Sequence, residues 1–322
     1  MFVLMLTGIL ADEIARRGPI SFHEFQQTAL YHPQYGFYRR HRDPFGARGD
    51  FYTAEQVQPV FGLLMARVVE RLQQRMPERF EVVELGAGRE EMRPYFERWS
   101  YQAIESGYGQ LPAEIQGLVF GNEFLDALPV HLARKKDGVF LEVSVDGHED
   151  EFKYIDGAPV EGPLAQYLAK HGHHAPEGGL VEAHLDAVHW LERLSASLQR
   201  GFVMFIDYGF TERERIRFPQ GTLMSYWRHQ ADEDVLRNPG ERDITSHVPF
   251  TMIMDEANTL GFVVERFETL AQLLLDAGDG DHFAAALESQ NEQEAARRRG
   301  QLKTLLYGMG ETFRVLLLSR GV

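Results

Sequence analysis

The stretch VVELGAG, residues 82–88, runs from an apolar strand straight into a turn that contains two glycines. In an open α/β sheet, a ligand is received where a parallel strand passes through such a turn into a helix. Glycine lets the backbone approach the ligand closely, and the helix offers free N–H groups to a negative charge. A tight turn also needs glycine for steric reasons alone. The turn therefore predicts a doubly wound sheet, and it predicts a ligand only together with further features.

The pattern from residue 80 onwards supports such a sheet. Short apolar segments alternate with helical segments, which is typical of a parallel sheet covered on both faces. Two late apolar stretches, 262–267 and 313–319, predict an antiparallel pair at one edge of the sheet. The segment 181–198 is expected to be helical. The expected parallel strands are 80–85, 101–105, 118–121 and 202–207.

The first eighty residues are expected to be mainly helical. Residues 7–17 have helical spacing, and Ser21-Phe22-His23-Glu24 matches a capping box that opens a second helix. A loop rich in aromatic residues, glycine and charge follows at 35–53, and long loops of this kind are commonly functional. The sequence thus predicts an N-terminal helical region with a loop at 1–78. It predicts an α/β domain at 79–322 with a helical insertion around 160–200.

Composition excludes several classes of function. The chain has 33 Lys and Arg against 48 Asp and Glu, a net charge of −15, which disfavours nucleic acid and favours basic or neutral partners. It has no cysteine, so disulfides, thiolate nucleophiles and cysteine metal sites are absent. The first apolar run, 1–6, is too short for a membrane span or a signal peptide. The expected location is cytoplasmic, without a membrane.

The end of the second expected strand carries an acid at a spacing typical of nucleoside sites. Glu105 lies 19 positions after Gly86, close to the ~20 expected of an acid that grips ribose hydroxyls. Dinucleotides and S-adenosylmethionine both use this geometry. Glu91 stands at the last position of the dinucleotide fingerprint, where a carboxylate conflicts with pyrophosphate. S-adenosylmethionine is therefore favoured over NAD.

Ten motifs then carry a family resemblance, in family order from the N-terminus to the C-terminus. The chain resembles the MidA family, methyltransferase-fold proteins whose mitochondrial members are complex I assembly factors. The matching stretches are GPISFHEF (18–25), YHPQYGFY (31–38), GDFYTA (49–54), ELGAGR (84–89), NEFLDALPV (122–130), DYG (207–209), GTL (221–223), PG (239–240), DITSHVPF (243–250) and MGETFRVL (309–316).

The resemblance implies a Rossmann-like class I methyltransferase fold, α/β and mostly parallel with an antiparallel edge, plus N-terminal and inserted helices. It implies S-adenosyl-L-methionine as cofactor and protein arginine N-methylation as the activity. The partner would be a protein with an exposed arginine or basic segment, and a homodimer is possible. By motif, the cofactor residues are Glu84, Gly86, Gly88, Glu105 and Asn122, with Gly49, Asp50 and Thr53 as a lid.

Two departures from the family bear on function. Glu90 stands where relatives usually have glycine, and a charge there would oppose the methionine carboxylate of the cofactor. Only 17 positions separate Glu105 from Asn122, where relatives have a helix and a further strand that lines the adenine pocket. These departures keep open a catalytically impaired methyltransferase-fold protein that acts as a binding or assembly factor. A small-molecule methyltransferase, with a closed pocket, is a third alternative.

Carboxylates near the strand ends are the candidates for holding an acceptor guanidinium, because they can bind it bidentately and orient one nitrogen. These catalytic candidates are Glu123, Asp126, Asp207 and Asp243. Three of them have a structural alternative: Asp207 caps the next turn, and Glu123 and Asp126 lie at an ordinary helix N-terminus.

His247 is the candidate proton acceptor, because imidazole titrates near neutrality and Asp243 or Thr245 could orient it. Its structural alternative is a ring satisfied by the local backbone. No metal site is expected, since the loop histidines 171, 173 and 174 lack a clear carboxylate or helical spacing.

Overall fold

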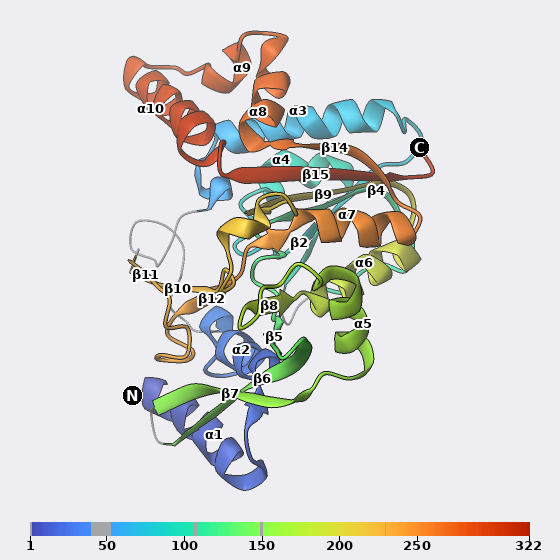
Figure 1. Cartoon of the computed structure of the whole chain (residues 1–322). Helices are drawn as coiled ribbons and strands as arrows, with labels where there is room; N and C mark the ends of the chain where they lie inside the picture. Colours follow the sequence, from blue (N-terminus) through green and yellow to red (C-terminus); the bar gives the residue numbers. More distant parts are fainter. Residues whose placement is uncertain (1, 40–52, 106–108, 149–150, 229) are drawn as a thin grey trace. The chain divides into compact units, whose positions relative to one another are not determined.

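The computed structural model describes residues 2–39, 53–105, 109–148, 151–228 and 230–322, and its chain forms two compact units (Figure 1). Unit 1 comprises Met1–Tyr52, Ala127–His189 and Phe210–His247, and unit 2 comprises Thr53–Asp126, Trp190–Gly209 and Val248–Val322. Each unit is assembled from three chain segments. The single boundary between residues 78 and 79 stays a prediction from the sequence.

Unit 2 is built on a seven-stranded sheet with the order β14-β15-β9-β4-β2-β3, and β13 pairs with β9 beside this path. The pairs β2–β3, β2–β4 and β4–β9 are parallel, whereas β15 is antiparallel to both β9 and β14. The predicted α/β sheet with an antiparallel edge is confirmed. The strands are β2 (Glu81–Leu85), β3 (Gln102–Ile104), β4 (Ile115–Asn122), β9 (Leu198–Phe210), β13 (Val248–Pro249), β14 (Val263–Thr269) and β15 (Phe313–Arg320).

The shortened segment after Glu105 has a direct effect on this sheet. Among the described strands, β3 pairs only with β2 and lies at the end of the sheet. Within the described residues, the chain passes from β3 to β4 with no strand between them, although β4 lies on the other side of β2. The loss of a strand that relatives have at this point stays a prediction.

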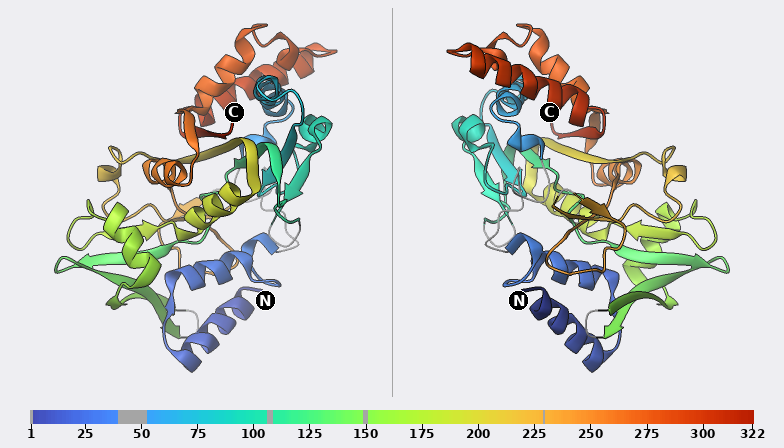
Figure 2. Two further views of the ribbon diagram at one scale, coloured as in Figure 1. Left: turned by 90° about the vertical axis from the view of Figure 1, so that its right-hand side faces the viewer. Right: turned by 90° about the vertical axis from the view of Figure 1, so that its left-hand side faces the viewer.

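Helices cover the sheet of unit 2. Where apolar residues recur at helical spacing, a helix has an apolar face to bury. Helix α3 buries Val60, Phe61, Leu64, Val68 and Leu72 along one face. Figures 1 and 2 show α3 beside α8 and α10. The helices are α3 (Val60–Gln74), α4 (Arg93–Phe96), α6 (Leu185–Ser197), α7 (Phe250–Thr259), α8 (Leu270–Asp279), α9 (Ala284–Leu287) and α10 (Glu292–Lys303), with the single turns η2 (Ala54–Gln56) and η3 (Glu97–Trp99) and the π-helical segment η5 (Thr304–Met309).

Unit 1 contains a five-stranded antiparallel sheet in the order β1-β6-β5-β8, with β7 pairing with β6, and a small sheet β11-β10-β12. The Ser21 hydroxyl accepts the Glu24 N–H at 3.2 Å, so the predicted cap of α2 is confirmed. Its elements are α1 (Phe2–Arg17), β1 (Ile20–Ser21), α2 (Phe22–Tyr31), η1 (Phe37–Arg39), β5 (His131–Lys136), β6 (Val139–His148), β7 (Glu151–Pro159), α5 (Gly162–His171), β8 (Leu180–Ala183), η4 (Arg215–Arg217), β10 (Met224–Trp227), β11 (Gln230–Asp232) and β12 (Asp243–Thr245).

The region around 160–200 contains the helices α5 and α6, as expected, and also strand β8 between them. The sequence did not predict that β8 belongs to a second sheet with β5, β6 and β7. Among the described helices, none combines the length and apolar character needed to cross a membrane.

Candidate functional site

The glycine turn after β2 has the backbone conformation that its sequence predicts. Gly86 has φ +66° and Gly88 has φ +51°, both in the left-handed region that favours glycine. The Gly86 N–H donates to the Ile104 carbonyl at 2.8 Å. The turn is therefore held against the end of β3.

Glu105 lies at this turn, as the nucleoside spacing predicts. Its Oε2 accepts the Gly88 N–H at 3.0 Å. Two predicted cofactor residues, 17 positions apart, are thus in direct contact. The contact brings an acidic side chain and a glycine backbone to the carboxyl ends of adjacent parallel strands.

Next to the turn lies a pair of buried carboxyl groups. Glu84 is completely buried and accepts a hydrogen bond from the Tyr101 hydroxyl. Burial is the main cause that raises the pKa of Glu84 to about 8, although the hydrogen bonds from Tyr101 and Glu55 oppose the shift. Burial and the charge of Glu84 likewise raise the pKa of Glu55 well above its usual range. The causes of these shifts among the described residues include no cation.

Glu55 was missed from the sequence. It follows the predicted lid residue Thr53, which is also buried, in the segment TAEQ. A single Glu in a polar segment resembles any surface acid, and no sequence signal reveals its burial. Gly49 and Asp50, the other predicted lid residues, lie outside the described residues.

Strand β4 ends at Asn122, which is linked to the next residue, Glu123. The Asn122 amide donates to Glu123 Oε1 at 3.2 Å, and the Ala54 N–H donates to the same oxygen at 3.1 Å. Glu123 has φ +51°, a strained conformation for a residue with a side chain. Asn122 Oδ1 is buried and accepts no hydrogen bond from the described residues. Strain and an unsatisfied acceptor therefore occur together at this strand end.

Asp207, which follows the β9 residue paired with Asn122, binds the segment that follows β4. Its Oδ2 accepts the N–H groups of Leu125 at 2.9 Å and Asp126 at 3.4 Å, and its Oδ1 accepts the Tyr208 N–H at 3.1 Å. Burial, followed by the charges of Asp126 and Glu123, raises the pKa of Asp207 well above its usual range. Asp207 thus caps the turn after β4, whereas its structural alternative was a cap on the turn that follows Asp207 itself.

Asp243 and His247 belong to unit 1, so the structure does not group them with the other candidates. Asp243 Oδ1 accepts the Tyr38 hydroxyl at 2.8 Å. The His247 ring packs edge-on against Phe218 at 5.2 Å between centroids, and burial lowers its pKa. The predicted orientation of His247 by Asp243 remains a prediction.

Two side chains border the glycine turn. A Cβ added to Gly86 would lie 3.0 Å from the Phe124 ring, which packs edge-on against Trp190 at 5.1 Å between centroids. Glu90 forms an ion pair with Arg93, so a nearby cation compensates its charge. Glu90 also has φ +59°, a conformation that suits the glycine usual in relatives.

Comparisons with known proteins identify the family of the chain. Residues 90–268 match the model of the family described as "Putative S-adenosyl-L-methionine-dependent methyltransferase". The chain belongs to this family. The resemblance to MidA proteins is thereby confirmed, and S-adenosylmethionine is the cofactor.

The relatives span nearly the whole chain. The mitochondrial protein arginine methyltransferase NDUFAF7 homolog of Drosophila melanogaster is 26% identical, covering 97% of this chain and 84% of its own length. The human protein is 24% identical, with 96% and 82% covered. A Burkholderia thailandensis crystal structure bound to S-adenosyl-homocysteine has 29% identity and a TM-score of 0.86, covering 100% of this chain and 93% of that chain.

These names overturn one expectation. The cytoplasmic location predicted from the sequence is wrong, because the Drosophila, rat and human relatives are all named as mitochondrial proteins. The expectation rested only on the length and charge of the first apolar run. These properties do not show in which compartment relatives of this family are found.

The residues present fit the cofactor. The buried Asn122 Oδ1 lacks a donor, and the Glu55–Glu84 pair lacks a cation among the described residues. The methionine part of S-adenosylmethionine carries an ammonium group, which supplies both N–H donors and positive charge. The ammonium group therefore suits both the unsatisfied Asn122 acceptor and the Glu55–Glu84 carboxyl pair.

Proposed function

We propose that this chain transfers a methyl group from S-adenosylmethionine to an arginine nitrogen of a protein. The observation that carries the proposal is the group of acidic side chains at the ends of β4 and β9, within the unit that holds the glycine turn. A guanidinium is planar and cationic, so carboxylates can bind it with two hydrogen bonds. The relatives named protein arginine methyltransferases support the same acceptor.

In this proposal, the ends of β2 and β3 hold the cofactor. Glu105 binds the ribose hydroxyls, and the backbone at Gly86 and Gly88 lies against the methionine part. Glu84, with Glu55 beside it, faces the ammonium group. Asn122 Oδ1 accepts a hydrogen bond from the same ammonium group. Gly49, Asp50 and Thr53 remain the proposed lid.

The acceptor side requires positioning more than covalent chemistry. When bound, S-adenosylmethionine would supply an electrophilic methyl group, which the acceptor nitrogen would take in line as S-adenosylhomocysteine leaves. Glu123 and Asp126 hold the guanidinium and orient one of its nitrogens. Asp207 positions both residues, because its carboxylate accepts backbone N–H groups of the segment that follows β4. Asp243 and His247 remain proposed as a further carboxylate and a proton acceptor.

The test combines binding with product analysis. Calorimetry of the intact protein should detect binding of S-adenosylmethionine. A mitochondrial protein extract incubated with the protein and methyl-labelled cofactor should then yield labelled methylarginine after acid hydrolysis. Glu123→Gln should lower this yield by about tenfold or more, because one charged hydrogen bond to the acceptor is lost.

Three outcomes would contradict the proposal. Label in methyllysine or in a small molecule would reject arginine as the acceptor. An equal yield from Glu123→Gln would reject its role. No cofactor binding at millimolar concentration would favour the binding or assembly factor instead.

A further inference from the structure

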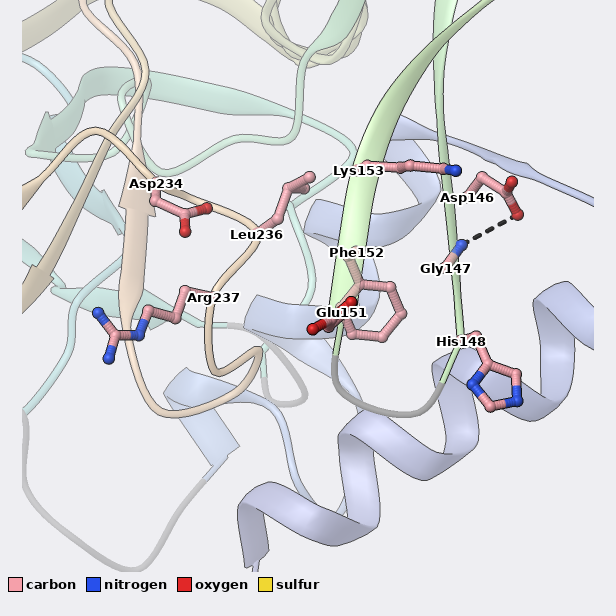
Figure 3. A pocket seen from close by; sticks show the side chains of 9 residues that line it. All are labelled: Asp146, Gly147, His148, Glu151, Phe152, Lys153, Asp234, Leu236 and Arg237. Carbon is pink, nitrogen blue, oxygen red and sulfur yellow. Dashed lines mark hydrogen bonds between the residues drawn. The ribbon is translucent and has the colours of Figure 1, made fainter.

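Unit 1 contains a pocket of about 790 Å³ that the methyltransferase site does not use. Its lining comes from β6, β7 and the segment 234–237 (Figure 3). Figure 3 shows the segment 234–237 on one side of β7 and β6 on the other. The pocket therefore reaches the side of β7 that faces away from β6, its partner among the described strands.

Strand β7 is an edge strand. It pairs with β6 from Glu151 to Pro159, and within the described part of the chain no strand pairs with its other side. Alternate residues of such a strand direct N–H and C=O groups outward, ready to pair with an added strand. In the later half of β7, the Asp156 side chain forms an ion pair with Arg134 of β5, with Nε and Oδ1 2.9 Å apart. The earlier half lines the pocket.

The directions of the charged side chains around the pocket favour a cationic ligand. In Figure 3 the carboxylates of Glu151 and Asp234 are directed into the space between β7 and the segment 234–237. The Lys153 ammonium is directed instead toward Asp146, its register partner on β6. The Arg237 guanidinium is directed away from β7.

The base of the pocket is apolar. Leu236 is buried, and the half-buried Phe152 packs edge-on against Phe25 at 5.5 Å between ring centroids. An aromatic ring attracts a cation placed over its face, and Arg does so more often than Lys. The combination of two carboxylates and an aromatic ring is a site for a basic side chain.

We propose that this pocket docks an extended basic segment of a partner protein, which pairs with the open edge of β7 and places an arginine or lysine side chain between Glu151 and Asp234. Main-chain pairing supplies affinity, and the pocket selects the basic side chain. The alternative reading is an edge protected by charge against aggregation. Protection needs charged side chains but neither a pocket nor an apolar base.

Fluorescence anisotropy with a labelled ten-residue peptide tests the proposal. The peptide is rich in Thr and Val and has one central Arg, and its competitor has citrulline, which keeps the shape and removes the charge. The Arg peptide should bind about tenfold more tightly. The double variant Glu151→Gln with Asp234→Asn should remove that preference, since two ion contacts are lost. A peptide N-methylated at alternate residues should bind at least tenfold more weakly, because it cannot pair with β7.

The matched control is Glu233→Gln, which changes an exposed acid next to Asp234 that does not line the pocket. It should bind the Arg peptide as the unaltered protein does, and all variants should retain their affinity for S-adenosylmethionine. Equal binding of the Arg and citrulline peptides, or equal loss in Glu233→Gln, would overturn the basic pocket. Equal binding of the N-methylated peptide, or displacement by free arginine at the same concentration, would overturn strand addition.

Discussion

At the scale of single residues, Gly86 is the position where the backbone conformation and the proposed cofactor site coincide. A methyl group there would meet the Phe124 ring at 3.0 Å and would also require a left-handed φ. We expect Gly86→Ala to weaken S-adenosylmethionine binding by about tenfold or more, the equivalent of ~1.4 kcal/mol.

Gly261→Ala is the control for this variant, because Gly261 lies in the same unit, has φ +86° and has no atom within 4 Å of an added Cβ. Both variants should lose about 1 kcal/mol of unfolding free energy from the left-handed φ. Only Gly86→Ala should lose affinity in calorimetry. Full affinity of Gly86→Ala would remove Gly86 from the site.

Glu84 should make stability depend on pH. Its pKa rises from 4.5 to about 8 in the folded chain, mainly because of burial. Between these values the folded chain binds more protons than the unfolded chain, so the free energy of unfolding should decrease as the pH rises from about 4.5 to 8. Glu84→Gln keeps an acceptor for Tyr101 and should flatten this slope. Urea unfolding across that range measures it, and an unchanged slope would show that Glu84 is ionised throughout.

At the scale of elements, the turn after β2 carries local strain that can be relieved. Glu90 has φ +59° and forms an exposed ion pair with Arg93. Glu90→Gly removes the strain, worth roughly 1 kcal/mol, and loses an ion pair worth less. We therefore expect a small gain in unfolding free energy, together with the tighter cofactor binding that the sequence predicts. A loss of stability in urea unfolding would show that the ion pair outweighs the strain.

The sequence predicts some elements well because their signals are local. The apolar runs of β2, β4 and β9, the Ser21 cap and the antiparallel edge were all recognised from residue type and spacing. The second sheet was missed because β7 is mostly exposed, with acids, a lysine and a glycine instead of clear alternation. In this sheet, the pairs β1–β6 and β5–β8 join residues far apart in the sequence, and periodicity does not reveal such contacts.

The same limit applies to the candidate site. The position of Glu105 near the glycine turn follows from a known spacing, whereas its hydrogen bond with the Gly88 N–H is seen only in the structure. The burial of Glu55 beside Glu84 follows from how separate elements pack, which no motif encodes. Asp207 was recognised as an important acid, yet only coordinates reveal that it binds the backbone after β4.

At the scale of the whole molecule, the two compact units should respond differently to the cofactor. The proposed cofactor residues described in the structure all lie in unit 2, whereas the β5–β8 sheet lies in unit 1. Hydrogen exchange with saturating S-adenosylmethionine should slow in peptides that cover 84–90 and 122–126. Peptides from β5 to β8 should exchange as before. Equal slowing in both units would show that the cofactor stabilises the whole chain as one cooperative body.

The position of β15 has a consequence for how the protein is made. This strand, Phe313–Arg320, lies between β9 and β14, which are synthesised earlier and do not pair with each other. Until Phe313–Arg320 have been synthesised, β14 has no partner among the described strands, and β9 lacks this antiparallel neighbour. Such unpaired edges are prone to aggregation. We therefore expect this part of the sheet to close only when β15 pairs with both of its neighbours.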